Sequence, residues 1–413
     1  MQLTVLKNTV LLLVLTLISC GNNLNKDKQS TLAIDSQTLA SQDTTIKQPI
    51  VGANQTEAYL KFINNKNVGV VANQTSVIFH EKGHTHLVDS LLALNVNIVS
   101  VFAPEHGFRG KADAGELVKD GVDTKTKLPI ISLYGNNKKP SDAQLQGIDI
   151  MIFDIQDVGA RFYTYISTLH YVMEACAENN IPVLILDRPN PNGHYIDGPI
   201  LEKEHQSFVG MHPVPVVHGM TIGEYAQMIN GENWLKDGIK CELNIIPVKH
   251  YTHQMPYSLP IKPSPNLPTD RAINLYPSLC FFEGTNVSAG RGTPKPFEIY
   301  GSPYLDRDLY AFKFLPQPND GAKHPKHQGM LCYGEDLSKG KYLAQLDLSY
   351  LINAYQNSID KPKFFNAFFT KLAGTKTLQK QIEMKLTADE IKNTWKDDLK
   401  AYDFMRQAYL LYP

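Results

Sequence analysis

The sequence predicts an α/β protein with a parallel sheet, followed by a second, smaller α+β part. Between residues 67 and 187, short β-branched runs alternate with segments of helical periodicity. This alternation indicates a parallel sheet that helices cover on both faces. From about residue 201 the pattern loosens into Pro-rich loops and scattered elements, which indicates a second lobe. We therefore expect a sheet domain at 56–200 and a C-terminal lobe at 201–413.

The elements of the sheet domain follow from the apolar pattern. Strands or helices are expected at 68–71, 87–94, 97–102, 148–154, 166–176 and 181–187. In the segment 166–176 one apolar stripe at helical spacing should lie on the sheet; it consists of Ile166, Leu169, Val172, Met173 and Cys176. Open α/β sheets bind ligands in the loops that follow their strands. Here those loops are 103–111, 155–165 and 188–197.

The second lobe is expected to contain a helix at 221–230, a strand at 241–248 and a helical part at 342–412. Thr221 has the character of an N-cap, and Glu224 three residues later completes a capping box. The stretch 263–303 is rich in Pro and Gly and shows little periodicity. Such a stretch in a compact domain predicts a functional loop.

The N-terminus has the features of a lipoprotein export signal. Lys7 precedes an apolar run at 10–17, and Ser19 precedes Cys20, so we expect a signal peptide at 1–20 and lipidation of Cys20. An ordinary secretory signal is the alternative. Residues 21–55 are polar and should form a disordered tether. The folded part is then expected outside the cytoplasm, anchored to a bacterial membrane through the lipid only.

Composition and cysteine spacing exclude several classes of function. A formal net charge of -1 with both signs scattered argues against nucleic acid as a partner. Cys176, Cys241, Cys280 and Cys332 form no CxxC pattern, so we expect buried thiols and no metal site, with one or two disulfides left open. No GxGxxG follows a strand, and we therefore expect no dinucleotide cofactor.

The loop 103–111 carries the first candidate catalytic residues. Glu105 and His106 follow a strongly apolar strand, and Gly107 permits a sharp turn there. Partial desolvation between Phe102 and Phe108 would favour the protonated carboxyl group, which suits a general acid. An ion pair of Glu105 with Arg109 is the structural alternative. His106 is a second candidate.

Two further loops supply candidate substrate-binding residues. Asp157, Arg161, Tyr163 and Tyr165 lie in the loop 155–165, where the two phenol rings can pack against a sugar. Alternatively, Asp157 caps a turn. Asn190 lies in a Pro-restricted loop expected to shape the rim of the site.

The second lobe adds candidates around a further carboxylate. His218 lies just before the helix at 221–230. Glu283 follows large apolar residues and precedes small hydrogen-bonding ones, which include Asn286. Arg291 is flanked by two glycines and can approach an anionic group closely.

Four of these segments, 104–110, 157–165, 187–191 and 282–286, resemble the NamZ-type exo-β-N-acetylmuramidases and occur in that family's order. The resemblance runs from about residue 67 to 413. It implies a glycoside hydrolase that releases N-acetylmuramic acid from the non-reducing ends of peptidoglycan-derived glycans. It also implies a Rossmann-like domain, a smaller C-terminal domain and an active site in the cleft between them.

The resulting hypothesis assigns Glu105 as general acid and Glu283 as base or electrostatic partner, because glycosidases ordinarily use two carboxyl groups. Retention, inversion and a substrate-assisted route in which Glu283 or Asp157 orients the N-acetyl group all stay open. The lactyl carboxylate of muramic acid calls for a cation, and Arg161 and Arg291 are the candidates. A rival hypothesis is a lipid-anchored protein that binds cell-wall sugars without catalysis.

Overall fold

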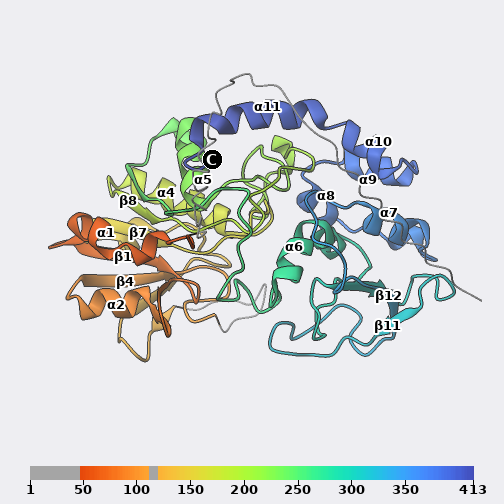
Figure 1. Ribbon diagram of the computed structural model, residues 1–413, viewed down its shortest axis with the longest axis horizontal. Helices are drawn as coiled ribbons and strands as arrows, with labels where there is room; N and C mark the ends of the chain where they lie inside the picture. The colour runs from red at the N-terminus through yellow and green to blue at the C-terminus, as the bar shows by residue number, and fades with distance from the viewer. Residues whose placement is uncertain (1–46, 111–119) are drawn as a thin grey trace, which may run out of the picture. The chain divides into compact units, whose positions relative to one another are not determined.

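The computed structural model describes residues 47–110 and 120–413, and Lys47–Pro413 forms one compact unit (Figure 1). The expected signal peptide, Cys20 and most of the expected tether lie outside the described residues. The end of that tether, however, belongs to the fold. Ile50 pairs with Lys249, and the backbone N–H of Gly52 donates to Asp187 at 2.8 Å. Among the described residues no helix combines the length and apolar character that crossing a bilayer requires.

A seven-stranded sheet confirms the predicted α/β class. Its strand order is β5-β6-β4-β1-β7-β8-β9, and every neighbouring pair is parallel except β5 with β6. The strands are β1 (Asn67–Ala72), β4 (Asn97–Ala103), β5 (Gly121–Val122), β6 (Pro129–Ser132), β7 (Ile150–Asp154), β8 (Val183–Leu186) and β9 (Leu243–Ile246). Because β9 pairs with β8, the sheet also uses chain from beyond residue 200.

Helices cover both faces of this sheet because strand side chains alternate between them. Val70 and Ile152 belong to the apolar cluster of α1 (Thr56–Ile63) and α2 (Leu87–Ala93), whereas Phe153 belongs to that of α4 (Tyr165–Glu178) and α5 (Ile222–Gly231). All five members of the predicted stripe on α4 are buried, which confirms that prediction. The Thr221–Glu224 capping box is present at the start of α5.

The remaining elements of the N-terminal part are short. They are the hairpin β2 (Val77–His80) and β3 (Gly83–His86), the helix α3 (Asp142–Leu145), and the 3-10 turns η1 (Gly52–Asn54), η2 (Lys203–His205) and η3 (Lys236–Gly238).

The segment 263–303, predicted as an irregular loop, contains regular structure. It holds α6 (Asp270–Leu279), η4 (Cys280–Gly284) and β10 (Ile299–Ser302). The Thr269 side chain caps α6 by accepting from the N–H of Ala272. Every residue of α6 from Arg271 to Leu279 is buried. Ala272, Leu275, Tyr276 and Leu279 recur at helical spacing, so the prediction of an irregular loop was wrong. Pro277 inside the helix and the Pro- and Gly-rich flanks obscured this short pattern.

The C-terminal part adds a small antiparallel sheet in the order β10-β12-β11 and a run of helices, as expected for 342–412. Its further elements are β11 (Phe312–Phe314), β12 (Cys332–Asp336), α7 (Ser349–Gln356), η5 (Lys361–Lys363), α8 (Phe368–Ala373), α9 (Thr377–Glu383), α10 (Ala388–Asn393), α11 (Lys396–Arg406) and η6 (Gln407–Tyr409).

Helix α11 carries the chain back to the N-terminal part, where the turn η6 that follows it contacts α5 (Figure 1). The Tyr402 hydroxyl donates to the carbonyl of His218 at 2.8 Å, and Arg406 donates to that of Gly219 at 2.8 Å. The four cysteines from Cys176 to Cys332 are buried free thiols, so none of them forms the disulfide that the sequence left open.

Candidate active site

A pocket of about 500 Å³ brings together five of the predicted site residues. Glu105, His106, Tyr163, Glu283 and Arg291 all line it. We call it the Glu105–Glu283 pocket. Two carboxyl groups separated by 178 positions in the chain therefore face one cavity, as a glycosidase requires.

Glu105 lies two residues beyond the end of β4. His106 (φ 71°) and Gly107 (φ 75°) both adopt left-handed backbone conformations, so the chain turns sharply at the carboxyl end of the strand. Thr164 Oγ1 donates to Glu105 Oε2 at 2.7 Å. The Tyr134 hydroxyl also hydrogen-bonds this carboxyl group, and burial together with the nearby Glu105 raises the pKa of Tyr134.

Glu283 lies on η4 and is paired with a cation. Arg291 Nε lies 3.0 Å from Glu283 Oε1. Burial raises the pKa of Glu283, but the positive charges of Arg291 and Lys326 outweigh this and leave the pKa of Glu283 below its usual value. The neighbouring Gly284 has no room for a side chain, because a Cβ there would come within 2.4 Å of the Cα of Phe369 on α8. Glu283 is thus held ionised on a tightly packed turn.

Lys326 organises the backbone that carries Glu283. Its ammonium group donates to the carbonyls of Phe282 (2.9 Å), Thr285 (2.6 Å) and Val287 (3.0 Å). Burial lowers the pKa of Lys326, and the charge of Glu283 partly offsets this. Three charge-assisted hydrogen bonds to one loop fix its conformation. No motif in the sequence marks this lysine.

Aromatic and polar residues that sequence reasoning missed complete the lining. They include Tyr134, Phe162, Thr164, Phe208, Tyr276, Phe297, His324 and Lys326. Phe162 and Thr164 lie in the loop 155–165, and Tyr276 and Phe297 lie in the stretch 263–303, both of which the sequence had indicated as functional. Neither spacing nor composition marked the segments that supply Tyr134, Phe208, His324 and Lys326. The result is a cavity with aromatic walls and two carboxyl groups, a combination suited to a sugar ring.

Six predicted site residues do not line this pocket: Asp157, Arg161, Tyr165, Asn190, His218 and Asn286. Arg161 is the clearest correction. Its guanidinium is buried and donates to four backbone carbonyls, those of Pro199 (2.8 Å), Val214 (2.7 Å), Leu372 (3.0 Å) and Ala373 (2.8 Å). These bonds tie the N-terminal part to the end of α8, so Arg161 is structural and unavailable to a substrate carboxylate.

Asp157 and His218 form a buried local pair. Asp157 Oδ2 accepts from the N–H of Gly159 at 2.7 Å, and His218 Nε2 lies 3.6 Å from the same oxygen. The capping alternative for Asp157 therefore describes its contacts better than a substrate-binding role.

Tyr165 and Asn190 also support the surrounding structure, whereas the Asn286 side chain makes no hydrogen bond among the described residues. The Tyr165 hydroxyl accepts from the Asn73 side-chain amide at 2.9 Å. The Asn190 amide donates to the carbonyl of Met220 at 2.9 Å. Both amide atoms of Asn286 are buried without a hydrogen-bond partner in the described part of the chain.

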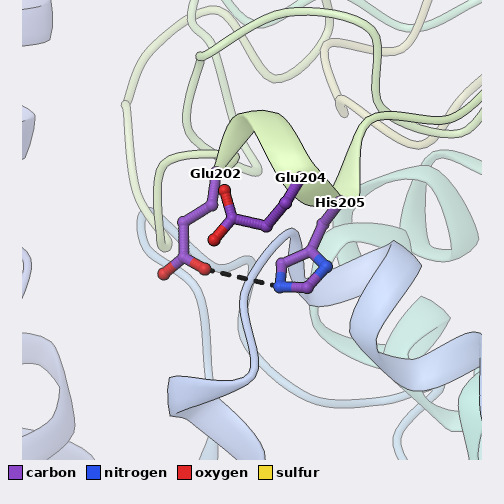
Figure 2. Close-up of side chains that lie close together, drawn as sticks. All are labelled: Glu202, Glu204 and His205. Carbon is purple, nitrogen blue, oxygen red and sulfur yellow. Dashed lines mark ion pairs between the residues drawn. The ribbon is translucent and has the colours of Figure 1, made fainter.

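One group of side chains within 47–110 and 120–413 comes close enough to hold a metal ion: Glu202, Glu204 and His205 on or beside η2. Figure 2 shows the ion pair between Glu202 and His205, whose atoms lie 3.4 Å apart. Both glutamates are exposed, and Glu202 also accepts from Thr375 at 2.6 Å. This arrangement is an ordinary surface cluster, and a metal-free reaction stays a prediction.

Comparisons with known proteins agree with this architecture. Residues 68–271 match the N-terminal and residues 274–412 the C-terminal domain of exo-β-N-acetylmuramidase NamZ. The peptidoglycan β-N-acetylmuramidase NamZ of Bacillus subtilis (strain 168) is 39% identical over 378 residues, which cover 86% of this chain and 89% of the relative.

Two crystal structures of DUF1343 family proteins from Bacteroides fragilis NCTC 9343 share the fold. One has a TM-score of 0.81 and 47% identity, covering 89% of this chain and 99% of that one. The other has a TM-score of 0.75 and 26% identity, covering 88% and 99%. Since the two matched domains together span most of the sequence, the chain belongs to the exo-β-N-acetylmuramidase NamZ family.

Proposed function

We propose that this protein is an exo-acting glycosidase that releases N-acetylmuramic acid from the non-reducing ends of peptidoglycan fragments. The observation that carries the proposal is the shared pocket of Glu105 and Glu283 in a chain of this family. The matching Bacillus protein is named for the same activity.

The environments of the two carboxyl groups suggest different roles. Glu283 is kept ionised by Arg291 and Lys326, which suits a base, a nucleophile or an electrostatic partner of the positively charged transition state. Glu105 contacts hydroxyl groups, which can accept as well as donate a hydrogen bond. Thr164 and Tyr134 can therefore support Glu105 in either protonation state, as a general acid that gives and regains a proton requires.

Arg291 is the remaining candidate for the lactyl carboxylate. Its Nε is used by Glu283, and its two terminal amino groups present the bidentate geometry that a carboxylate prefers. The guanidinium lies 5.0 Å from the ring centre of Phe297, which orients it within the pocket. A muramic acid residue would thus place its lactyl group near Arg291 and its ring among the aromatic walls.

The test is turnover of a chromogenic N-acetylmuramide by Glu105→Gln and Glu283→Gln, with Glu204→Gln as the matched control on an exposed glutamate outside the pocket. We expect each pocket variant to lose about 10²- to 10⁴-fold in kcat, and the control to retain wild-type activity. If Glu105→Gln turned over the substrate at the wild-type rate, Glu105 would have no part in the mechanism. If the wild-type protein releases no chromophore yet is stabilised by the sugar, it is the binding protein of the rival hypothesis.

We also propose that the protein is exported and anchored to a bacterial membrane through lipidated Cys20. The export signal at 1–20 and the presence of peptidoglycan outside the cytoplasm support this location. Replacing Cys20 by Ala in the full chain should shift the protein from the membrane fraction to the soluble fraction. Unchanged membrane fractionation of that variant would contradict the lipid anchor.

A further inference from the structure

A second cavity, of about 580 Å³, shares no lining residue with the Glu105–Glu283 pocket. Both tryptophans of the sequence, Trp234 and Trp395, line it together with Tyr402. We call it the tryptophan pocket. Its walls come from the chain around residue 200, from the segment after α5, and from α9 to α11.

The aromatic walls are held in place by contacts behind them. Trp234 stacks on His212 with ring centres 4.5 Å apart and planes at 17°. His212 in turn contacts the Tyr225 hydroxyl at 3.0 Å. Trp395 is 4% exposed, and Tyr402 is anchored through its hydroxyl to the carbonyl of His218. The rings are therefore positioned before any ligand binds, which lowers the entropic cost of binding.

The charges that line the tryptophan pocket are all negative. Glu202, Glu232 and Asp398 contribute carboxylates, and none of its described lining residues is Lys, Arg or His. Aliphatic side chains, including those of Leu378 and Met405, complete the lining. Indole rings attract cations through their π-faces, most strongly among the aromatic side chains. Carboxylates and indoles around an aliphatic surface suit a cation that has an apolar stem.

We propose that the tryptophan pocket binds a primary ammonium group on an aliphatic chain, as in the side chain of lysine or another diamino acid within a peptide. A free amino acid is a weaker ligand because its own carboxylate would meet the carboxylates of the pocket. A hydroxyl-rich sugar lacks both the charge and the apolar stem.

The tryptophan pocket and the proposed active site are built from different residues. The buried Arg161 connects the two linings, because it binds the carbonyl of Pro199, which lines the tryptophan pocket, and that of Leu372, which lines the Glu105–Glu283 pocket. Since neither Glu105 nor Glu283 lines the tryptophan pocket, a ligand of that pocket should bind whether or not Glu105 is functional.

Intrinsic fluorescence tests the proposal directly, because both tryptophans of the chain line this pocket. The titrants are Nα-acetyl-lysine amide, its neutral Nε-acetylated analogue as the matched control, and free lysine. We expect a saturable change with the first, at least about fivefold weaker binding of the neutral analogue, and weaker binding of free lysine. The Glu105→Gln protein should give the same titration, whatever the fate of its activity.

The double variant Glu232→Gln, Asp398→Asn keeps the size of both side chains and the acceptor that Glu232 offers to Tyr409. It should weaken binding of Nα-acetyl-lysine amide by about tenfold while its thermal midpoint stays near that of wild type. Equal titrations by the charged and the neutral ligand, the absence of a saturable signal, or unchanged affinity in the folded double variant would each overturn the proposal. Free lysine binding as tightly as the peptide analogue would overturn the peptide assignment.

Discussion

Replacing Arg291 by Met should move the acid limb of the pH–activity profile to higher pH. The Nε of Arg291 lies 3.0 Å from the Glu283 carboxylate, and an opposite charge at such a distance typically lowers a carboxyl pKa by about 1–3 units. The desolvation that raises the pKa of Glu283 persists after the substitution. The protonated form of Glu283 should then appear at higher pH than in the wild-type protein.

The sign follows from the role of the ionised group. If activity needs Glu283 as a carboxylate, its lowered pKa keeps the enzyme active at lower pH. Removal of Arg291 then raises the lowest pH at which the enzyme is active. The measurement is kcat/KM against pH with the chromogenic N-acetylmuramide, with Arg291→Lys as the charge-retaining control. A smaller shift in the Lys variant supports a Coulombic cause. An acid limb at the wild-type pH in Arg291→Met, in a folded protein, would refute the reasoning.

The same ion pair affects stability independently of activity. A carboxyl group whose pKa is lowered by folding stabilises the protein above its unfolded pKa, and this stabilisation is lost as the pH falls through the folded pKa. Wild-type unfolding in urea should therefore become easier on acidification through that window. In Arg291→Met the pKa of Glu283 in the folded protein should be less depressed. Acidification through the same window should then lower the free energy of unfolding of this variant less than that of the wild-type protein.

Three further outcomes follow from single contacts. Arg161→Met leaves four buried carbonyls without their donor and should lower the free energy of unfolding by about 4 kcal/mol in urea titrations; an unfolding midpoint near that of wild type would contradict a structural role. Thr164→Val removes the 2.7 Å hydrogen bond to Glu105 and should reduce kcat by about tenfold with little change in thermal midpoint; unchanged kcat would show that this bond does not position the acid. Since the cysteines from Cys176 to Cys332 are free and buried, a reductant should leave the thermal midpoint unchanged, and a clear decrease would reveal a disulfide.

Strand patterns predicted the part of the site that the parallel sheet positions. Glu105 follows β4, and an apolar strand followed by a glycine-rich loop is visible in one sequence. Glu283 was found through its chemical neighbourhood, a carboxylate between large apolar residues and small polar ones. Both signals are local in the sequence. The two residues share one pocket because the loops at the carboxyl ends of the strands, where α/β sheets bind ligands, meet the C-terminal part of the chain.

The residues that sequence reasoning missed or misplaced depend on contacts between distant segments. Lys326 bonds three carbonyls about 40 positions away, and Arg161 reaches carbonyls more than 200 positions away. Neither contact leaves a spacing pattern. The helix α6 was missed for a different reason, since its apolar pattern is short and Pro277 lies inside it, within a stretch whose Pro and Gly content is typical of a loop.

Arg161 and Arg291 show why a loop arginine is an ambiguous signal. Both lie in loops that were expected to form the site, yet Arg161 satisfies buried carbonyls while Arg291 pairs with a carboxylate in a cavity. Backbone carbonyls buried where two parts of a chain meet need donors as much as a substrate anion does. An arginine is therefore a candidate for anion binding only once its own neighbourhood is known to leave guanidinium N–H groups facing the cavity. Arg291 lines the pocket and, among the described residues, bonds Glu283 through its Nε alone, and the pH profile of its variants tests its coupling to Glu283.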